Sequence, residues 1–251
     1  MKKTALFKRI AALSLCALMS LSLAACRDPN GSGLNTKDAQ ECVQVEMDTT
    51  YKGDFAGFVK FYSNVSTSDA KEQYDYNIEG ETNFLLYSLG PTSLEDSSTS
   101  MDPSAMQLHR AKELYKSIYA KSDYSIVSSS KQDDGTFAVK VTVRPIDLLT
   151  ALYDNWAEYF DPFWEKFDSD QMNEYLDGLT DEEFYDWYAT VYAPEYYDTL
   201  LDLLEATIPN LGYKGEKSIV VQVQQSEDGS LYISNEDWQN LDDLIIDYSG
   251  E

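Results

Sequence analysis

The sequence predicts an α+β fold in which helices pack on a four-stranded antiparallel sheet made of two hairpins. Apolar residues alternate strictly over 137–143, after an Asp-Asp-Gly turn at 133–135. A second alternating stretch at 219–223 precedes a similar turn at 227–229. Elsewhere apolar residues recur every three or four positions, which is the spacing of a helix face. Antiparallel hairpins with separate runs of helices are typical of the α+β class.

The helices expected before the first hairpin are marked by capping residues and glycines. Thr36 is a suitable N-cap, and Gly53 follows the last periodic residue of the first helix. Asp54 caps a short second helix, and a third runs from Ser66–Asp69 to Leu89, with Gly80 as a break. Asp102-Pro103 then opens a fourth helix with a first-turn proline. A strand with Tyr124, Ile126 and Ser128 on one side comes next.

The segment between the hairpins is the most aromatic in the chain. Rings at intervals of three and four indicate a helix from Ile146 to Phe167, which Asp161-Pro162 is expected to divide. Thr180 and Glu183 form a capping box for the next helix, and Pro194 is expected to kink or break the chain beyond it. After the second hairpin, Asn235 is expected to cap a last amphipathic helix.

The N-terminus has the three parts of a secretory signal. A basic start precedes an apolar run over 10–23, which is too short to span a bilayer permanently. The run closes on Leu23-Ala24-Ala25-Cys26, which resembles the lipobox of bacterial lipoproteins. This resemblance implies residues 1–25 as signal peptide and a diacylglyceryl group on Cys26. Residues 26–36 are then a flexible linker, and 37–251 a single extracytoplasmic domain. Ordinary secretion with a chance cysteine is the alternative.

The charge of the chain restricts its partners. The formal net charge is −25, and residues 1–25 contain four of the 19 basic residues and none of the 44 acidic ones. The processed chain therefore has a charge of −29, which repels nucleic acids and anionic lipid headgroups. Membrane attachment would depend on the acyl chains of Cys26. A cationic partner is favoured and a nucleic acid is excluded.

Catalytic and metal-binding patterns are weak throughout. After processing, Cys42 is the remaining internal cysteine, and it fits burial better than reactivity. His109 is the single histidine, and the two Ser-x-x-Lys matches lack the companion elements of penicillin-binding enzymes. Asp168-Ser169-Asp170 starts like a calcium loop that the next residues do not continue. The sequence therefore predicts no catalytic residue, cofactor or dedicated metal site.

The aromatic segment is the better indication of a function. Its helices have more rings than one inward face can bury, so some rings should be exposed or line a groove. Exposed Tyr and Trp side chains among acids suit a glycan, a peptide or a cationic partner. The residues expected to form this candidate binding surface are Tyr159, Trp164, Tyr185, Tyr192 and Tyr196.

Three features resemble uncharacterised surface lipoproteins of Gram-positive, clostridial-type bacteria. These are the Lys-Gly-Asp-Phe turn at 52–55, the segment 134–148, and the final strand, turn and strand before an acidic helix. Such proteins are linked to cystatin-like or nuclear-transport-factor-2-like folds, so the resemblance implies a fold of that kind. It implies no catalytic residues.

Together these observations predict a lipid-anchored protein on the outer face of the cell membrane, acting as a non-enzymatic binding or interaction domain. Its partners would be the membrane, through Cys26, and a cell-envelope protein, a glycan or a cationic molecule. Two alternatives remain open. One is a cell-envelope glycan or peptidoglycan hydrolase that uses carboxylates. The other is a solute-binding lipoprotein of a transporter, which is disfavoured because strands and helices do not alternate.

Overall fold

A computed structural model describes residues 33–62, 65–91, 102–227 and 229–248. Contacts divide the chain into two compact units. The first comprises the described parts of 1–78, 118–147 and 212–250, and the second comprises 79–117 and 148–211. The predicted signal peptide, Cys26 and most of the predicted linker lie outside the described residues.

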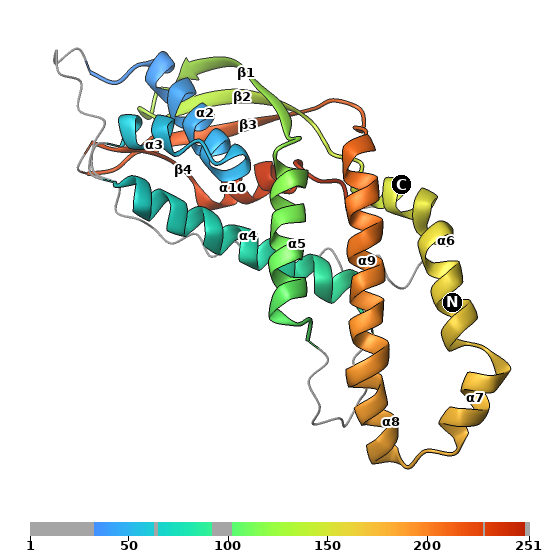
Figure 1. Ribbon diagram of the computed structural model, residues 1–251. Coiled ribbons are helices and arrows are strands. Elements are labelled where there is room, and N and C mark those ends of the chain that lie inside the picture. Colours follow the sequence, from blue (N-terminus) through green and yellow to red (C-terminus); the bar gives the residue numbers. More distant parts are fainter. Residues whose placement is uncertain (1–32, 63–64, 92–101, 228, 249–251) are drawn as a thin grey trace. The chain divides into compact units, whose positions relative to one another are not determined.

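The first unit is built on a four-stranded antiparallel sheet, as predicted (Figure 1). The order is β1-β2-β3-β4, so the two hairpins join through β2 and β3. These central neighbours are far apart in sequence because the helices of the second unit are inserted between them. The strands are β1 (Asp123–Lys131), β2 (Phe137–Arg144), β3 (Lys217–Gln225) and β4 (Leu231–Ile233).

One face of this sheet is buried, as the alternation predicts. Phe137, Val139, Val141 and Val143 of β2 are buried, and the side chains between them are more exposed. The predicted alternation in β1 is wrong at Ser128. A register shift between Ile126 and Ser128 leaves Ser128 exposed, because an extra residue in one strand reverses the faces that follow.

The helices of the first unit begin and end close to their predicted residues. In α2 (Thr36–Lys52) the N-cap is Asn35, one residue before the predicted Thr36, and Gly53 ends the helix with φ 64°. Asp54 accepts a hydrogen bond from the Gly57 N–H at the start of α3 (Phe55–Phe61). Helix α10 (Asn235–Asp242) is capped by Ser234 instead of the predicted Asn235.

Two helices of the second unit differ from prediction. Helix α4 (Thr67–Leu89), which begins in the first unit, continues through Gly80 without a break. Helix α6 (Leu148–Phe167) contains Pro162 in its interior and is not divided there. Pro162 has no N–H to donate to the Glu158 carbonyl. Both residues are exposed, so water can hydrate that carbonyl instead.

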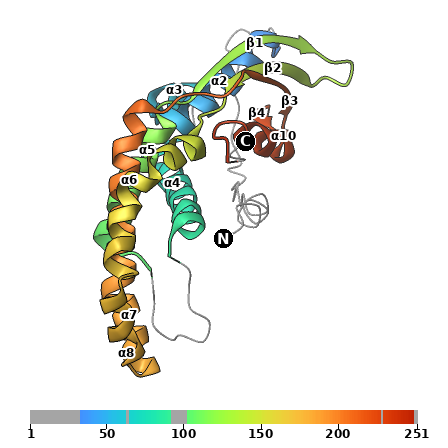
Figure 2. The same ribbon diagram turned by 90° about the vertical axis from the view of Figure 1, so that its right-hand side faces the viewer.

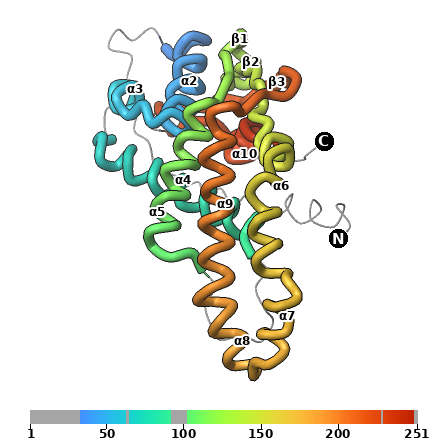
Figure 3. The backbone as a smooth tube through the Cα atoms, turned by 45° about the vertical axis from the view of Figure 1, so that its right-hand side comes forward, coloured from blue at the N-terminus to red at the C-terminus, as the bar shows by residue number. Residues whose placement is uncertain are grey.

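The remaining helices of this unit start at or near the predicted caps. Helix α5 begins at Ala105, where Ser104 accepts a hydrogen bond from the Gln107 N–H, rather than at Asp102. Helices α5, α6 and α9 run side by side, and α7 and α8 lie at one end of α6 and α9 (Figures 2 and 3). Their bounds are α5 (Ala105–Tyr119), α7 (Asp170–Asp177), α8 (Asp181–Trp187), a π-helical segment η1 (Tyr188–Tyr192), α9 (Ala193–Thr207) and a 3-10 turn η2 (Ile208–Asn210).

Within the part of the chain that the structure describes, no helix combines the length and apolar character needed to cross a bilayer.

Candidate functional site

Four aromatic side chains of α8 and η1 form a closed circuit of ring contacts in the second unit. We call Phe184, Trp187, Tyr188 and Tyr192 the aromatic quartet. Centroids lie 6.1 Å apart between Phe184 and Trp187, and 5.9 Å apart between Trp187 and Tyr192. Tyr188 completes the circuit, 4.7 Å from Tyr192 and 6.2 Å from Phe184. These separations are those of interacting rings.

The quartet rests on buried rings of α6. Tyr192 makes edge contacts with Phe163 and Phe167, each with centroids 5.2 Å apart. Trp187 also meets Phe167, at 5.9 Å. Phe163 and Phe167 are buried, whereas all four quartet rings are only half-buried. Buried rings therefore hold the quartet from behind while part of its surface stays accessible.

The local backbone contributes to this arrangement. Thr180 and Glu183 form the predicted capping box, which fixes the start of α8. The helix then widens to a π turn over 188–192, where the Ala193 N–H bonds to the Tyr188 carbonyl. Pro194 lies in the first turn of α9 and has no N–H to donate to the Thr190 carbonyl. Such π turns occur frequently at functional sites.

This end of the second unit is poorly covered. None of the residues of α7, α8 and η1 is buried. Tyr175 is 52% exposed, and Val191, between two quartet members, is 40% exposed. Apolar side chains at this density are ordinarily buried, so this end of the second unit has apolar surface available for contact.

The surroundings of the quartet are strongly acidic. Residues 148–211 contain sixteen acidic residues and one basic residue, Lys166. Lys166 pairs with Glu195, and its ammonium group lies 4.9 Å from the centre of the Phe167 ring. Burial, followed by Tyr188 and the negative charge of Asp168, raises the pKa of Tyr192 to about 12. The excess of acids over bases in this segment therefore opposes anions and favours cations.

The five predicted surface residues have different environments. Tyr159 is half-buried and lines a shallow, open hollow of about 400 Å³ with Asp202, Glu205 and Ala206. Trp164 is half-buried against Phe163, with centroids 4.9 Å apart. Tyr185 is half-buried and touches the quartet through Phe184, at 6.0 Å.

Tyr192 and Tyr196 differ most clearly in burial and contacts. Tyr192 belongs to the quartet, whereas Tyr196 is 8% exposed and its hydroxyl donates to the Leu89 carbonyl at 3.0 Å. Tyr196 therefore packs inside the second unit and is not part of the accessible aromatic surface.

Three quartet members were not among the predicted surface residues. The helical spacing places Phe184, Trp187 and Tyr188 on an inward face, yet α8 buries none of its residues. Aromatic side chains at 184, 185, 187 and 188 lie on all sides of this short helix, so one buried face cannot hold all of them. This crowding is the signal in the sequence that could have identified an exposed aromatic surface.

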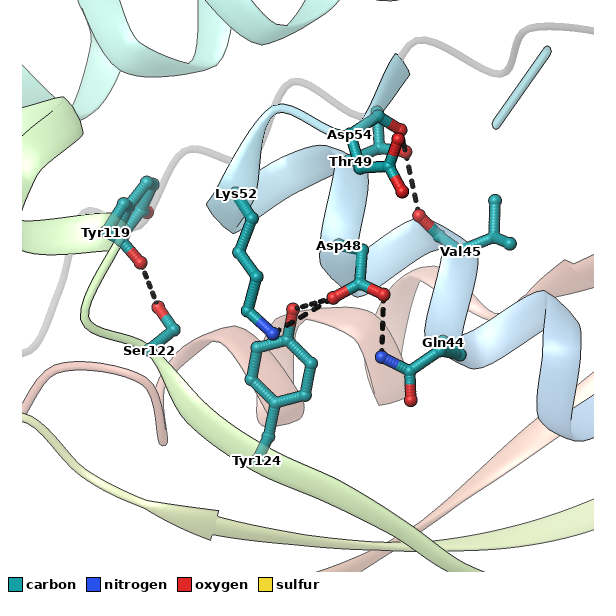
Figure 4. Close-up of polar contacts among 9 residues, drawn as sticks. All are labelled: Gln44, Val45, Asp48, Thr49, Lys52, Asp54, Tyr119, Ser122 and Tyr124. Atoms are coloured by element: carbon teal, nitrogen blue, oxygen red, sulfur yellow. Dashed lines mark hydrogen bonds and ion pairs between the residues drawn. The ribbon is translucent and has the colours of Figure 1, made fainter. Parts of the chain in front are cut away.

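A polar cluster in the first unit has a structural explanation (Figure 4). The Asp48 carboxylate accepts hydrogen bonds from the Tyr124 hydroxyl at 2.7 Å, the Gln44 amide at 2.7 Å and the Lys52 ammonium at 3.0 Å. Burial works against its ionisation, but these three donors hold its pKa below the usual value. The cluster joins α2 to β1. The three hydrogen bonds stabilise the negative charge of the Asp48 carboxylate.

A second cluster surrounds the buried hydroxyl of Tyr62. This hydroxyl donates to Glu46 at 2.6 Å and lies 3.3 Å from the Leu231 carbonyl and 3.5 Å from the Cys42 sulfur. Burial raises the pKa of Glu46 to about 7, and the hydrogen bond from Tyr62 opposes that rise. Cys42 is buried, so the thiol is part of the interior of this unit.

Among the described residues, no group of three or more His, Cys, Asp or Glu side chains is placed to hold a metal ion. Cys26, the predicted site of lipidation, is outside the described residues.

Comparisons with known proteins add a distant relative. No protein-family model matches the chain. Over 142 residues the chain is 28% identical to the membrane-associated protein TcaA of Staphylococcus aureus (strain MW2). This alignment covers 55% of the chain but only 28% of TcaA.

A solved structure of a proposed lipoprotein, YcdA of Bacillus subtilis subsp. subtilis str. 168, is also similar. It matches 84% of this chain and 56% of its own, at 14% identity and a TM-score of 0.45. A score below 0.5 does not establish a shared fold, so the cystatin-like and nuclear-transport-factor-2-like expectations remain predictions.

Proposed function

We propose that this chain is a lipid-anchored bacterial surface protein that acts as a non-enzymatic binding domain through the aromatic quartet. The similarity to a staphylococcal membrane-associated protein supports a surface or membrane-associated role. The apolar run that ends on Leu23-Ala24-Ala25-Cys26 supports attachment of a lipid to Cys26 on the outer face.

The single observation that supports the binding role is the partial exposure of four connected rings. An aromatic ring stabilises the folded state when its large apolar area is buried. Four half-buried rings therefore contribute less to stability than four buried rings would. A partner that covers these rings would recover this stabilisation. Tyr185, which touches Phe184, extends this surface.

Binding can be measured on residues 27–251 without the lipid. Trp156, Trp164 and Trp187 lie in the second unit and Trp238 in the first, so Trp238→Phe restricts indole fluorescence to the second unit. Titration with peptidoglycan fragments, neutral oligosaccharides and basic peptides should change this fluorescence with one class. A saturable change that Tyr188→Leu and Tyr192→Leu abolish supports the proposal, and no saturable change with any class contradicts it.

The same titrations distinguish binding from catalysis. A binding domain leaves the glycan fragments intact, so their mass spectra should be unchanged after prolonged incubation. New fragments that accumulate in proportion to protein concentration would instead establish the hydrolase alternative.

A further inference from the structure

We propose that the aromatic quartet binds a basic peptide segment in which Lys or Arg side chains lie beside apolar ones. This inference rests on the proposed binding function and specifies the class of partner. It combines the exposure of the quartet, the charge around it, and the way the protein already holds its own cations.

The charge of the second unit restricts the sign of the partner. Over 148–211 sixteen acidic residues face one basic residue, and Arg110 of α5 pairs with only two of these acids, Asp202 and Glu205, so this segment repels a second copy of itself and an anionic membrane. A positively charged partner is attracted to the same surface. Of the partners that could cover the exposed rings, charge complementarity therefore favours a positively charged one.

The protein repeatedly uses a ring and a carboxylate together to hold a cation. Lys166 pairs with Glu195 and lies over Phe167. In the first unit, Lys52 pairs with Asp48 and lies 4.1 Å from the centre of the Tyr124 ring. Both cations combine ion pairing with a cation–π contact.

The quartet offers the same two elements on an accessible surface. The rings of Tyr188 and Tyr192 are stacked, with 22° between their planes, and both are half-buried. Exposed carboxylates at Glu182 and Asp186 are on the same short helix that leads into the quartet. A guanidinium or ammonium group over a quartet ring would therefore also be attracted by nearby acids.

The apolar surface at this end favours a peptide. Val191 is 40% exposed within the π turn, and α7 and α8 bury none of their residues. A purely ionic polymer would leave this surface in contact with water. A peptide with apolar side chains beside its cations covers it, so the surface fits a peptide better than a simple polycation.

The test uses residues 27–251 and three synthetic peptides, with binding followed by calorimetry. The first peptide repeats the unit Leu-Lys-Lys-Leu, the second replaces every Leu by Ser, and the third replaces every Lys by Glu. We expect the first to bind most tightly, the second much more weakly, and the third not at all. Equal binding of the first two, abolished by moderate salt, would show simple attraction to a polyanion and overturn the proposal.

Matched variants locate the site. Tyr188→Leu with Tyr192→Leu keeps apolar volume but removes two ring faces, and should weaken binding of the Leu-Lys peptide roughly 5- to 30-fold. Tyr76→Leu, which changes an exposed ring of the first unit, should leave the affinity unchanged. Glu182→Gln with Asp186→Asn should also weaken binding, whereas Glu41→Gln with Glu72→Gln in the first unit should have less effect. Equal effects in the quartet and control variants would overturn the proposal.

The outcomes also separate this inference from the proposed function. If no peptide binds but a neutral glycan does, and the Leu variants abolish that binding, then the quartet is a binding surface and the peptide inference is wrong. If the Leu variants alter no binding of any kind, both are wrong. Circular dichroism of each variant, with a thermal midpoint close to that of the parent, excludes misfolding as the cause.

Discussion

Glu46 links the protonation of one side chain to the stability of the first unit. Burial raises its pKa to about 7, so the native state favours the neutral acid relative to the unfolded chain, whose value is near 4.5. A protonated Glu46 could donate to the Tyr62 oxygen and leave the Tyr62 hydroxyl to donate to the Leu231 carbonyl, which lies 3.3 Å away. The carboxylate form accepts from Tyr62 instead.

We therefore expect Glu46 to contribute stability at low pH that is lost as pH rises. The contribution is fully present below the unfolded pKa of 4.5 and disappears as pH rises through about 7. The rise in the pKa of Glu46 corresponds to a change on the order of 3 kcal/mol in the free energy of unfolding between low and high pH. Urea unfolding of the Glu46→Gln variant should show stability close to the parent near pH 4.5 and higher than the parent at pH 8.

Glu72 provides the control for this measurement. It is exposed in the same unit, so Glu72→Gln removes one charge without removing a buried acid. The free energy of unfolding of the Glu72→Gln variant should stay within a few tenths of a kcal/mol of that of the parent at both values of pH. A Glu46→Gln difference that does not change with pH would show that this acid ionises normally.

At the scale of elements, the π turn of 188–192 determines how the quartet is arranged. The turn places one more residue between α8 and α9 than a regular helix would hold, and it sets the contact between Tyr188 and Tyr192. Because a π turn is less favourable than an α-helical one, its presence is consistent with a functional role.

Deleting Ala189 should convert this turn to a regular α-helix. The flanking helices keep their phase, so we expect unfolding stability to stay the same or rise by about 0.5–2 kcal/mol. The spacing of Tyr188 and Tyr192 changes from four residues to three, which alters their stacked contact at 4.7 Å, so binding of the Leu-Lys peptide should weaken. Deleting Lys121 from the loop between α5 and β1, a position outside the π turn, should not weaken it. Unchanged binding by the Ala189 deletion would show that the π turn has no part in recognition.

The elements show how far local sequence determines this fold. The capping box at Thr180 and Glu183, the end of α2 at Gly53 and the alternation in β2 depend on neighbouring residues alone, and these predictions are confirmed. Pro162 shows the limit of such reasoning. Its effect on α6 depends on whether the carbonyl of Glu158 faces water, which no local pattern reports.

The candidate site was only partly predictable for the same reason. The excess of rings predicted that some would be accessible, and Tyr192 is half-buried. Tyr196 is only four residues further along, yet it is buried and bonded to Leu89. The difference depends on which rings face α6 and on the change from α to π spacing. Both are consequences of tertiary packing.

At the scale of the whole molecule, the excess of acids and the proposed anchor act together. A charge of −29 after processing opposes binding to anionic lipids, so attachment must depend on acyl chains. The same charge attracts basic partners near the membrane. In the proposed function, the lipid on Cys26 determines the location of the protein, and the acidic second unit recognises the partner.

The anchor can be tested with the full chain expressed in a Gram-positive host. Cells grown with a palmitate analogue should label the protein, and Cys26→Ala should abolish the label because the thiol is the acceptor. Cys16→Ala, which changes a cysteine inside the apolar run, should retain it. Label that persists in the Cys26→Ala protein would refute lipidation at this residue.

The most direct test of the proposed binding surface is the indole N–H spectrum of ¹⁵N-labelled residues 27–251, with and without the Leu-Lys peptide. The four tryptophans place one probe in the quartet, Trp187, and one in the first unit, Trp238. Substitution of each Trp by Phe assigns the four signals. We predict that the Trp187 signal shifts progressively on titration while the Trp238 signal stays in place. A shift at Trp238 with Trp187 unmoved would contradict binding at the quartet.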